Sequence, residues 1–132
     1  MAETAYKIAL LMKRRPDISV EAFRDYYENR HAPLASKYSQ GVTRYVRRYL
    51  DPQPHPETGP GGELPYDVIT ELWFDDEATF KRTLAYITTA KMPAEIVEDE
   101  KNFLDRSSFK IVTYTECESD LSRVETAGDL TG

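Results

Sequence analysis

The sequence predicts a single α+β domain, with four strands in one antiparallel sheet and helices covering one face of that sheet. Three observations predict this fold. The chain has 132 residues, which is enough to build one hydrophobic core and too few to build two. Four segments carry the apolar and β-branched residues typical of strands, and the regions between them include apolar residues at helical spacing. These elements follow one another in the order β-α-β-β-α-β.

The first predicted elements are a strand and a helix. Residues 6–14, YKIALLMKR, are apolar at almost every central position, which indicates a strand covered on both faces. The helix that follows begins after Ser19, a good N-cap residue, and Ile18 and Phe23 are spaced to form a hydrophobic staple. Pro33 either breaks this helix or opens a short second one. The inward stripe of the helix is expected to contain Phe23, Tyr26, Tyr27, Arg30 and His31.

The second and third strands flank a long loop. Residues 42–50, VTRYVRRYL, alternate strictly, and residues 66–74, YDVITELWF, are rich in residues that favour strands. Residues 51–65 hold five of the eight prolines and three of the six glycines. We interpret them as a loop, because neither side of the chain is large enough to fold alone. Loops of this length serve as functional lids or are plain insertions.

The last third of the chain contains a helix, a shorter helix and the fourth strand. Asp75 or Asp76 caps a helix, and Pro93 opens a further short one. The residues expected to face inward here are Phe80, Leu84, Ile87, Ile96, Val97, Phe103 and Leu104. Residues 107–116, SSFKIVTYTE, form the fourth strand. We therefore expect one domain over residues 1–116, followed by a loose polar tail over residues 117–132.

The order of elements is that of the ferredoxin-like arrangement, and it leaves one face of the sheet without helices. The first, third and fourth strands carry apolar residues on both faces, whereas the helices cover one face only. Four such strands would expose a larger apolar patch than a soluble monomer usually shows. We therefore expect a homodimer in which a second copy packs sheet against sheet and closes a barrel about a two-fold axis.

Composition excludes several classes of function. The net charge of −6 is spread along the chain, which argues against a nucleic-acid surface. The longest apolar run, IALLM, is far too short to cross a membrane, and residues 1–7 lack the layout of a signal peptide, so we expect a cytoplasmic protein. Cys117 is the one cysteine, and we interpret it as a free surface thiol. The two histidines, His31 and His55, show no metal-ligand spacing, and the chain has no GxGxxG, P-loop or GxSxG motif, so no metal or other cofactor is expected. A lone axial histidine such as His31 could still hold haem.

His31 is the first candidate for catalysis. Histidine is the side chain whose ordinary pKa lies closest to neutrality, which suits general acid–base work. Helical spacing places His31 on the same stripe as Phe23 and Tyr27, facing the sheet. A plain alternative is an imidazole at a helix C-terminus, where free carbonyls and the helix dipole favour it.

Tyrosines and one arginine form a second group of candidates. Tyr45, Arg47 and Tyr49 share one face of the second strand, and Tyr27 comes from the first helix. Tyrosine supplies an apolar wall with a polar tip, which suits a pocket for a flat phenolic ligand. Packing in the core or at an interface is the alternative for each of them. Tyr27 and Tyr45 are the strongest candidates for the pocket.

Glu71 and Trp73 are candidates from the third strand. Glu71 lies between Ile69 and Trp73 on one face of an otherwise apolar segment, where a carboxylate must be paired or have a raised pKa. We consider Glu71 as a catalytic base and Trp73 as a ligand contact. An ion pair with Arg44, Arg47 or Arg48 is the structural alternative for Glu71. Asp99 and Lys101 lie in a charge-rich helix and are explained by a solvated face.

Several segments, taken in order, resemble the EthD family. These are a strand ending in Lys-Arg, then PDISVEAFRDYYENRHAPLA, a Tyr-rich strand, YDVITELWFDDEATF and EDEKNFLDRSSFKIVTYTE, over about residues 6–116. The most specific parts are HAP after an aromatic-rich helix and ELWF before an acidic helix start. The resemblance implies a dimeric α+β barrel with a pocket between the helices and the sheet of each subunit. Similar proteins include cofactor-free dehydratases, decarboxylases, lactone isomerases and oxygenases, haem enzymes, and many proteins without an assigned activity.

The residues and the resemblance together lead to one main functional hypothesis. We expect a cofactor-independent dehydratase, isomerase or decarboxylase that acts on an aromatic or polyketide-like small molecule. His31 would transfer the proton, and tyrosine hydroxyls would polarise a carbonyl or phenol. One alternative is a non-catalytic accessory dimer that binds a small molecule in the same cleft. The other is an oxygenase, either haem-dependent or cofactor-free.

Overall fold

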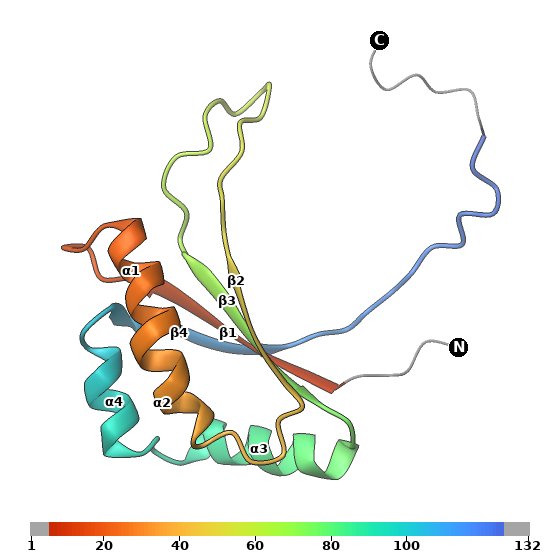
Figure 1. Cartoon of the computed structure of the whole chain (residues 1–132). Helices are drawn as coiled ribbons and strands as arrows, with labels where there is room; N and C mark the ends of the chain where they lie inside the picture. Colours follow the sequence, from red (N-terminus) through yellow and green to blue (C-terminus); the bar gives the residue numbers. More distant parts are fainter. Residues whose placement is uncertain (1–5, 126–132) are drawn as a thin grey trace.

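The sheet has the predicted four antiparallel strands. The computed structural model describes residues 6–125, and its strands lie in the order β2-β3-β1-β4 (Figure 1). β1 (Tyr6–Arg14) is central and pairs with β3 (Val68–Phe74) on one side and with β4 (Leu104–Thr113) on the other. β2 (Arg44–Tyr49) forms the edge beside β3. This order and the antiparallel pairing confirm the ferredoxin-like prediction.

The helices lie together on one side of the sheet (Figure 1). Between β1 and β2 the chain forms α1 (Val20–Tyr26), the π-helix η1 (Tyr27–His31) and α2 (Ala32–Ser36). Between β3 and β4 it forms α3 (Glu77–Thr89) and α4 (Ala94–Glu100). The side chains of Ser19 and Asp76 cap α1 and α3 by accepting the backbone N–H groups of Ala22 and Thr79. The predicted cap at Ser19 is therefore confirmed, and Asp76 is the residue that caps α3.

A π-helical turn, which was not predicted from the sequence, separates α1 from α2. In this turn the backbone N–H of Ala32 donates to the carbonyl of Tyr27, five residues earlier. Pro33 follows at the start of α2. Its ring has no N–H for the carbonyl of Asn29 and would collide with that carbonyl in a regular α-helix, so a wider turn just before it is favoured. Pro33 thus widens the helix at His31 without ending it.

Strand register determines which side chains share a face of the sheet. Opposite residues of an antiparallel pair point to the same side. Leu10 is opposite Thr70 and Ile111, and these three face the helices together with Met12 and Val68. The core between sheet and helices consists of Met12, Phe23, Tyr27, Ala32, Val68, Phe103 and Leu104, all buried.

The other face of the sheet, which we call the outer face, carries the alternate residues of each strand. Ala9 is opposite Glu71 and Val112, and Glu71 is opposite Val46. The same alternation places Leu11, Ile69 and Trp73 on this face. No helix of the described part of the chain covers it (Figure 1).

The boundaries of two strands differ from the prediction. β2 begins at Arg44, because Val42 donates its N–H to Ser39 in a turn that precedes the strand. β4 begins at Leu104, three positions before the predicted start, and its register with β1 shifts between Leu11 and Lys13. At this irregularity the hydroxyl of Ser108 accepts the backbone N–H of Lys13 at 2.8 Å. Polar residues therefore continue the strand through a bulge that hydrophobic alternation did not indicate.

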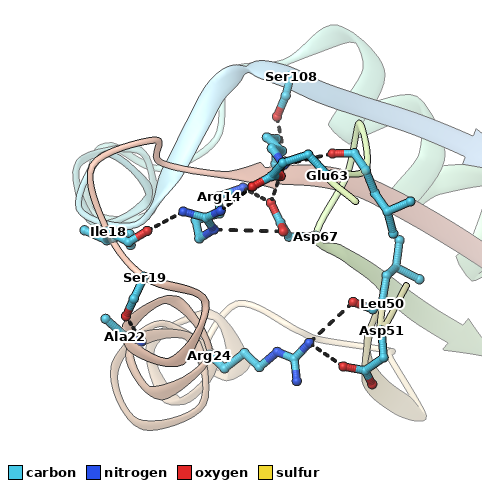
Figure 2. A network of polar contacts seen from close by, with 12 residues as sticks. Arg14, Ile18, Ser19, Ala22, Arg24, Leu50, Asp51, Glu63, Asp67 and Ser108 are labelled. Atoms are coloured by element: carbon cyan, nitrogen blue, oxygen red, sulfur yellow. Dashed lines mark hydrogen bonds and ion pairs between the residues drawn. The ribbon is translucent and has the colours of Figure 1, made fainter. Parts of the chain in front are cut away.

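The proline-rich loop is attached to the end of β1 and to α1 (Figure 2). Arg14 contacts Glu63 at 3.0 Å, and its backbone N–H donates to the carboxylate of Asp67 at 2.8 Å. Arg24 of α1 pairs with Asp51 at the other end of the loop at 2.9 Å. These contacts hold both ends of the loop against the body of the domain. The loop is therefore a structured insertion at this end of the sheet.

Candidate active site

A cavity of about 380 Å³ lies between the helices and the sheet. Its walls are mainly apolar, formed among others by Leu10, Leu72, Ile87, Ile96, Phe109 and Ile111. The polar residues that line it include the buried Tyr27, His31 and Glu100 and the half-buried Tyr45, together with Tyr38, Ser39, Gln40, Arg82, Thr83 and Tyr86. An apolar chamber with a few convergent polar groups is the usual form of a site for a small organic ligand. The loop of residues 51–65 contributes nothing to this lining, so it is not a lid over the cavity.

His31 is the last residue of the π-helix and is 4% exposed. Its ring packs on Phe103, with ring centroids 4.8 Å apart, and meets Tyr27 edge to face at 5.5 Å. Its Nδ1 lies 2.8 Å from Oδ2 of Asp99 in α4. The imidazole is therefore fixed on two sides by rings and on a third by a carboxylate.

Asp99 belongs to a short chain of hydrogen bonds. The Tyr26 hydroxyl donates to Oδ1 of Asp99 at 2.6 Å, and Asn102 donates to that hydroxyl at 2.9 Å. Burial opposes ionisation of Asp99, but the hydrogen bonds from Tyr26 and His31 outweigh it, so the pKa of Asp99 lies below its ordinary value. Asp99 is therefore an ionised acceptor for the Nδ1–H of His31.

This carboxylate determines which nitrogen of His31 is free. A carboxylate at Nδ1 favours the tautomer with its proton on that atom, and it stabilises the imidazolium formed when Nε2 takes up a second proton. Nε2 has no hydrogen-bond partner among residues 6–125. The pair can thus accept a proton at Nε2 and return it there.

Two tyrosine hydroxyls lie deep in the same cavity. Tyr27 hydrogen-bonds to the hydroxyl of Thr70 at 2.6 Å and lies 3.3 Å from the hydroxyl of Tyr45. Burial is the main reason that the pKa of Tyr27 and the pKa of Tyr45 are both raised. Both phenols therefore stay protonated at neutral pH and can donate a hydrogen bond to a ligand oxygen.

Arg47 and Tyr49 share the helix-facing side of β2, but they bind Glu28 and do not line the cavity. Arg47 donates hydrogen bonds from two of its nitrogens to this carboxylate, at 2.8 and 2.9 Å. The hydroxyl of Tyr49 donates a hydrogen bond to the same carboxylate. The hydrogen bonds from Arg47 lower the pKa of Glu28. Burial is the main cause of a raised pKa for Tyr49. These two residues support the tyrosine cluster from outside the cavity.

Glu71 and Trp73 lie on the outer face, on the opposite side of the sheet from His31. Glu71 accepts hydrogen bonds from Trp73 at 3.0 Å and Tyr114 at 2.7 Å, and it pairs with Arg48 at 3.1 Å. Burial opposes its ionisation, but these three donors outweigh burial and lower its pKa. This environment fits the alternative of an ion pair, and neither Glu71 nor Trp73 reaches the cavity of His31.

Asp99 and Glu100 are the site residues that the sequence analysis missed. Asp99 was expected on a solvated face, although Asp99 and Glu100 follow Ile96 by three and four positions. These are the spacings that place residues on one side of a helix, and Ile96 was predicted to face inward. The helical spacing therefore indicated that Asp99 and Glu100 face inward with Ile96, but the acidic composition of the segment favoured a solvated face.

Two further features concern the described residues as a whole. Among residues 6–125 there is no group of three or more His, Cys, Asp or Glu side chains arranged to hold a metal ion. None of the helices in this part of the chain is long and apolar enough to cross a membrane. Cys117 is exposed and free, as predicted.

Comparisons with solved structures show the same fold in other proteins. An EthD family protein from Bacillus halodurans is 19% identical, covers 86% of this chain and 100% of its own, and has a TM-score of 0.53. An EthD-like protein from Ralstonia eutropha is 15% identical, covers 95% of this chain and 98% of its own, and has a TM-score of 0.53. A hypothetical protein from Arabidopsis thaliana is 17% identical, covers 91% of this chain and 95% of its own, and has the same score.

Comparison at the level of sequence gives the family. No curated protein matches this chain significantly. The model of the EthD domain matches residues 15–107, which include α1, the π-helix with His31, β2, β3 and the Asp99–Glu100 segment. The chain therefore belongs to the EthD family.

Proposed function

We propose that this chain is a cofactor-independent enzyme that moves a proton on an aromatic or polyketide-like small molecule. Dehydration, isomerisation and decarboxylation all need such a transfer next to a carbonyl or phenol oxygen. The observation that carries the proposal is the pair formed by His31 and Asp99, 2.8 Å apart, whose imidazole lines a mainly apolar cavity. A buried imidazole held by a carboxylate is a common arrangement for general acid–base catalysis.

The shape and lining of the cavity support a flat, largely apolar ligand. A volume of about 380 Å³ lies in the range of small-molecule sites and has room for a molecule of a few fused rings. Ile96, Phe109 and Ile111 offer apolar walls for such rings. A charged sugar or nucleotide would leave many polar groups without partners on these walls.

The polar groups have complementary roles in the proposed reaction. Nε2 of His31 takes a proton from a carbon next to the ligand carbonyl, and Asp99 stabilises the resulting imidazolium. The hydroxyl of Tyr45 donates a hydrogen bond to the oxygen on which negative charge develops. Tyr27 holds Tyr45 in place through the contact at 3.3 Å. Return of the proton to another atom of the ligand completes an isomerisation.

The proposed enzyme is a homodimer built through the outer face of the sheet. Leu11, Val46, Ile69 and Val112 lie on this face and remain partly exposed, and no helix of the described chain covers them. A second copy packed sheet against sheet would remove these residues from water. The same contact would enclose the Glu71 network, which suits a structural role for that carboxylate.

The experiment that tests this function uses 2-tetralone, a bicyclic ketone with exchangeable protons beside its carbonyl. In D₂O, proton NMR follows their replacement by deuterium, with 2-naphthol as a non-exchanging competitor. We expect the protein to accelerate the exchange above the rate in buffer and to lose this effect when 2-naphthol fills the cavity. Binding of 2-tetralone without faster exchange would contradict an enzyme and support the accessory binding protein.

A further inference from the structure

We propose that Glu100 is the acid of this cavity, which gives a proton to the ligand oxygen while His31 removes one from carbon. This proposal rests on the proposed function and assigns the second of the two proton-transfer groups that such a reaction needs. Glu100 is the last residue of α4, which packs against the π-helix that carries His31. Its side chain lines the cavity and the residue is only 6% exposed.

The two oxygens of the Glu100 carboxyl differ in their partners. Oε1 accepts a hydrogen bond from Nε of Arg106 at 3.2 Å, and the Arg106 side chain is 43% exposed. Oε2 has no hydrogen-bond partner among residues 6–125. Only Arg14 and Arg24 have buried side-chain polar atoms without a partner in the described residues, so Oε2 is an accessible oxygen of a residue that lines the cavity, and a ligand there can reach it.

The groups around Glu100 come from every element packed against it. His31 lies on the π-helix, Asp99 on α4, Arg106 on β4 and Tyr45 on β2, all close enough to act on its charge. Burial raises the pKa of Glu100, although Arg106 and His31 act in the opposite direction. Glu100 therefore holds a proton at higher pH than an ordinary glutamic acid does.

Adjacent carboxyls of α4 are thus suited to different tasks. Asp99 accepts a hydrogen bond on each oxygen of its carboxylate, from Tyr26 and from His31, and remains ionised. Glu100 has one partner and a free oxygen on the cavity wall. Environments that give two neighbouring acids different pKa values are typical of sites where one acid stabilises charge and the other carries a proton.

A dehydration would use both groups in one step. Nε2 of His31 takes the proton from the carbon beside the carbonyl, and the electrons of that C–H bond form the new C=C bond. The C–O bond to the leaving hydroxyl breaks as Glu100 donates its proton to that oxygen, and water departs. His31 then releases its proton and Glu100 regains one from solvent, which restores both groups.

The first part of the test observes Glu100 directly. Carbon-detected NMR titration of the side-chain carboxyls in the full chain, assigned by comparison with Glu100→Gln, gives the pH at which each loses its proton. We expect Glu100 to titrate above its ordinary value of 4.5 and Asp99 to titrate below its ordinary value of 3.8. A Glu100 that titrates at or below 4.5 overturns its assignment as the acid, whatever the activity of the protein.

The second part uses the exchange of 2-tetralone as a function of pH. Glu100→Gln should lower the rate by about a hundredfold and remove the fall at alkaline pH that reports loss of the Glu100 proton. Glu98→Gln changes an exposed acid of the same helix that pairs with Lys101, and it should leave the profile unchanged.

The outcomes separate the two proposals. If His31→Ala abolishes exchange and Glu100→Gln keeps the wild-type rate and pH profile, Glu100 is not the acid and the proposed function stands. If the wild-type protein does not accelerate exchange, both proposals fail together. Thermal unfolding of Glu100→Gln, followed by circular dichroism, verifies that a lower rate does not come from a loss of fold.

Discussion

His31 and Asp99 stand 68 positions apart in the chain, and the structure brings Nδ1 of one to within 2.8 Å of Oδ2 of the other. Neither residue alone indicates catalysis, because a histidine at a helix end and an aspartate in an acidic helix are both ordinary. Together they form a pair of a buried imidazole and a half-buried carboxylate, beside two tyrosine hydroxyls that stay protonated.

Asp99→Asn tests whether the carboxylate sets the tautomer of His31. The variant removes the charge that favours a proton on Nδ1, so we expect the neutral imidazole to shift its proton towards Nε2 and exchange of 2-tetralone to slow by about a hundredfold or more. Long-range proton–nitrogen NMR spectra report the tautomer directly. An unchanged tautomer in Asp99→Asn would show that Asp99 does not position His31. Glu98→Gln is the matched control on the same helix.

Tyr27→Phe tests the buried hydroxyl network. The substitution leaves the hydroxyl of Thr70, itself fully buried, without its partner at 2.6 Å, and we expect the free energy of unfolding to fall by about 1–2 kcal/mol. Adding Thr70→Val removes the orphaned hydroxyl, so the double variant should recover part of this loss. Urea unfolding gives the values. Strictly additive losses would mean that the two hydroxyls do not interact.

The stability of the protein should depend on pH through Glu100. Burial raises its pKa in the folded state above the ordinary 4.5, so the folded chain binds this proton more tightly than the unfolded chain does. The resulting contribution to stability is fully present below the unfolded pKa and is lost as the pH rises through the folded pKa. Compared with wild type, Glu100→Gln should therefore gain in relative stability as the pH rises from below the ordinary value of 4.5 through the raised folded pKa of Glu100. A difference in unfolding free energy that stays constant over this range would contradict the burial of an acid here.

Ala35→Trp tests whether the cavity is the ligand site. Ala35 of α2 lines the cavity, and an indole there would occupy space that a ligand needs. We expect binding of 2-naphthol, followed by its fluorescence, to weaken by about tenfold or more. Ala85→Trp adds the same ring at an exposed position of α3 outside the lining and should bind as wild type does. Equal binding by both variants would place the ligand elsewhere.

Ile69→Arg tests the proposed dimer. A guanidinium in the middle of the outer face would have to be buried without a partner between two sheets, so we expect sedimentation equilibrium to show a monomer. Val20→Arg is the control, since Val20 is 39% exposed on α1 in the helix layer. A wild-type protein that sediments as a monomer would contradict the dimer itself.

Periodicity predicted the part of the fold that depends on local pattern. Alternating residues marked the strands, and the spacing of Phe23, Tyr27 and His31 indicated a helix face directed at the sheet, as observed. The wider turn at His31 was not predicted, because Pro33 is compatible with both a helix break and a new helix start. Composition identified residues 51–65 as a loop, but it held no information on the ion pairs that fix this loop beside β1.

The alternation of side chains along a strand does not identify the face that the helices cover, as the residues of β3 illustrate. A period of two shows that Glu71 and Trp73 share a face and that Thr70 lies on the other, but it does not show which face the helices cover. Only the packing of the whole chain places Thr70 beside Tyr27 and Glu71 beside Arg48. The candidates from β2 and β3 were therefore chosen without knowledge of the side on which the cavity lies.

The most direct measurement of the central claim compares the two histidines in the exchange of 2-tetralone. His31→Ala removes the imidazole in the cavity wall, whereas His55→Ala removes one in the exposed proline-rich loop. We predict a loss of at least about a hundredfold in the exchange rate for His31→Ala and an unchanged rate for His55→Ala. A folded His31→Ala protein that exchanges 2-tetralone as fast as wild type would contradict proton transfer by His31.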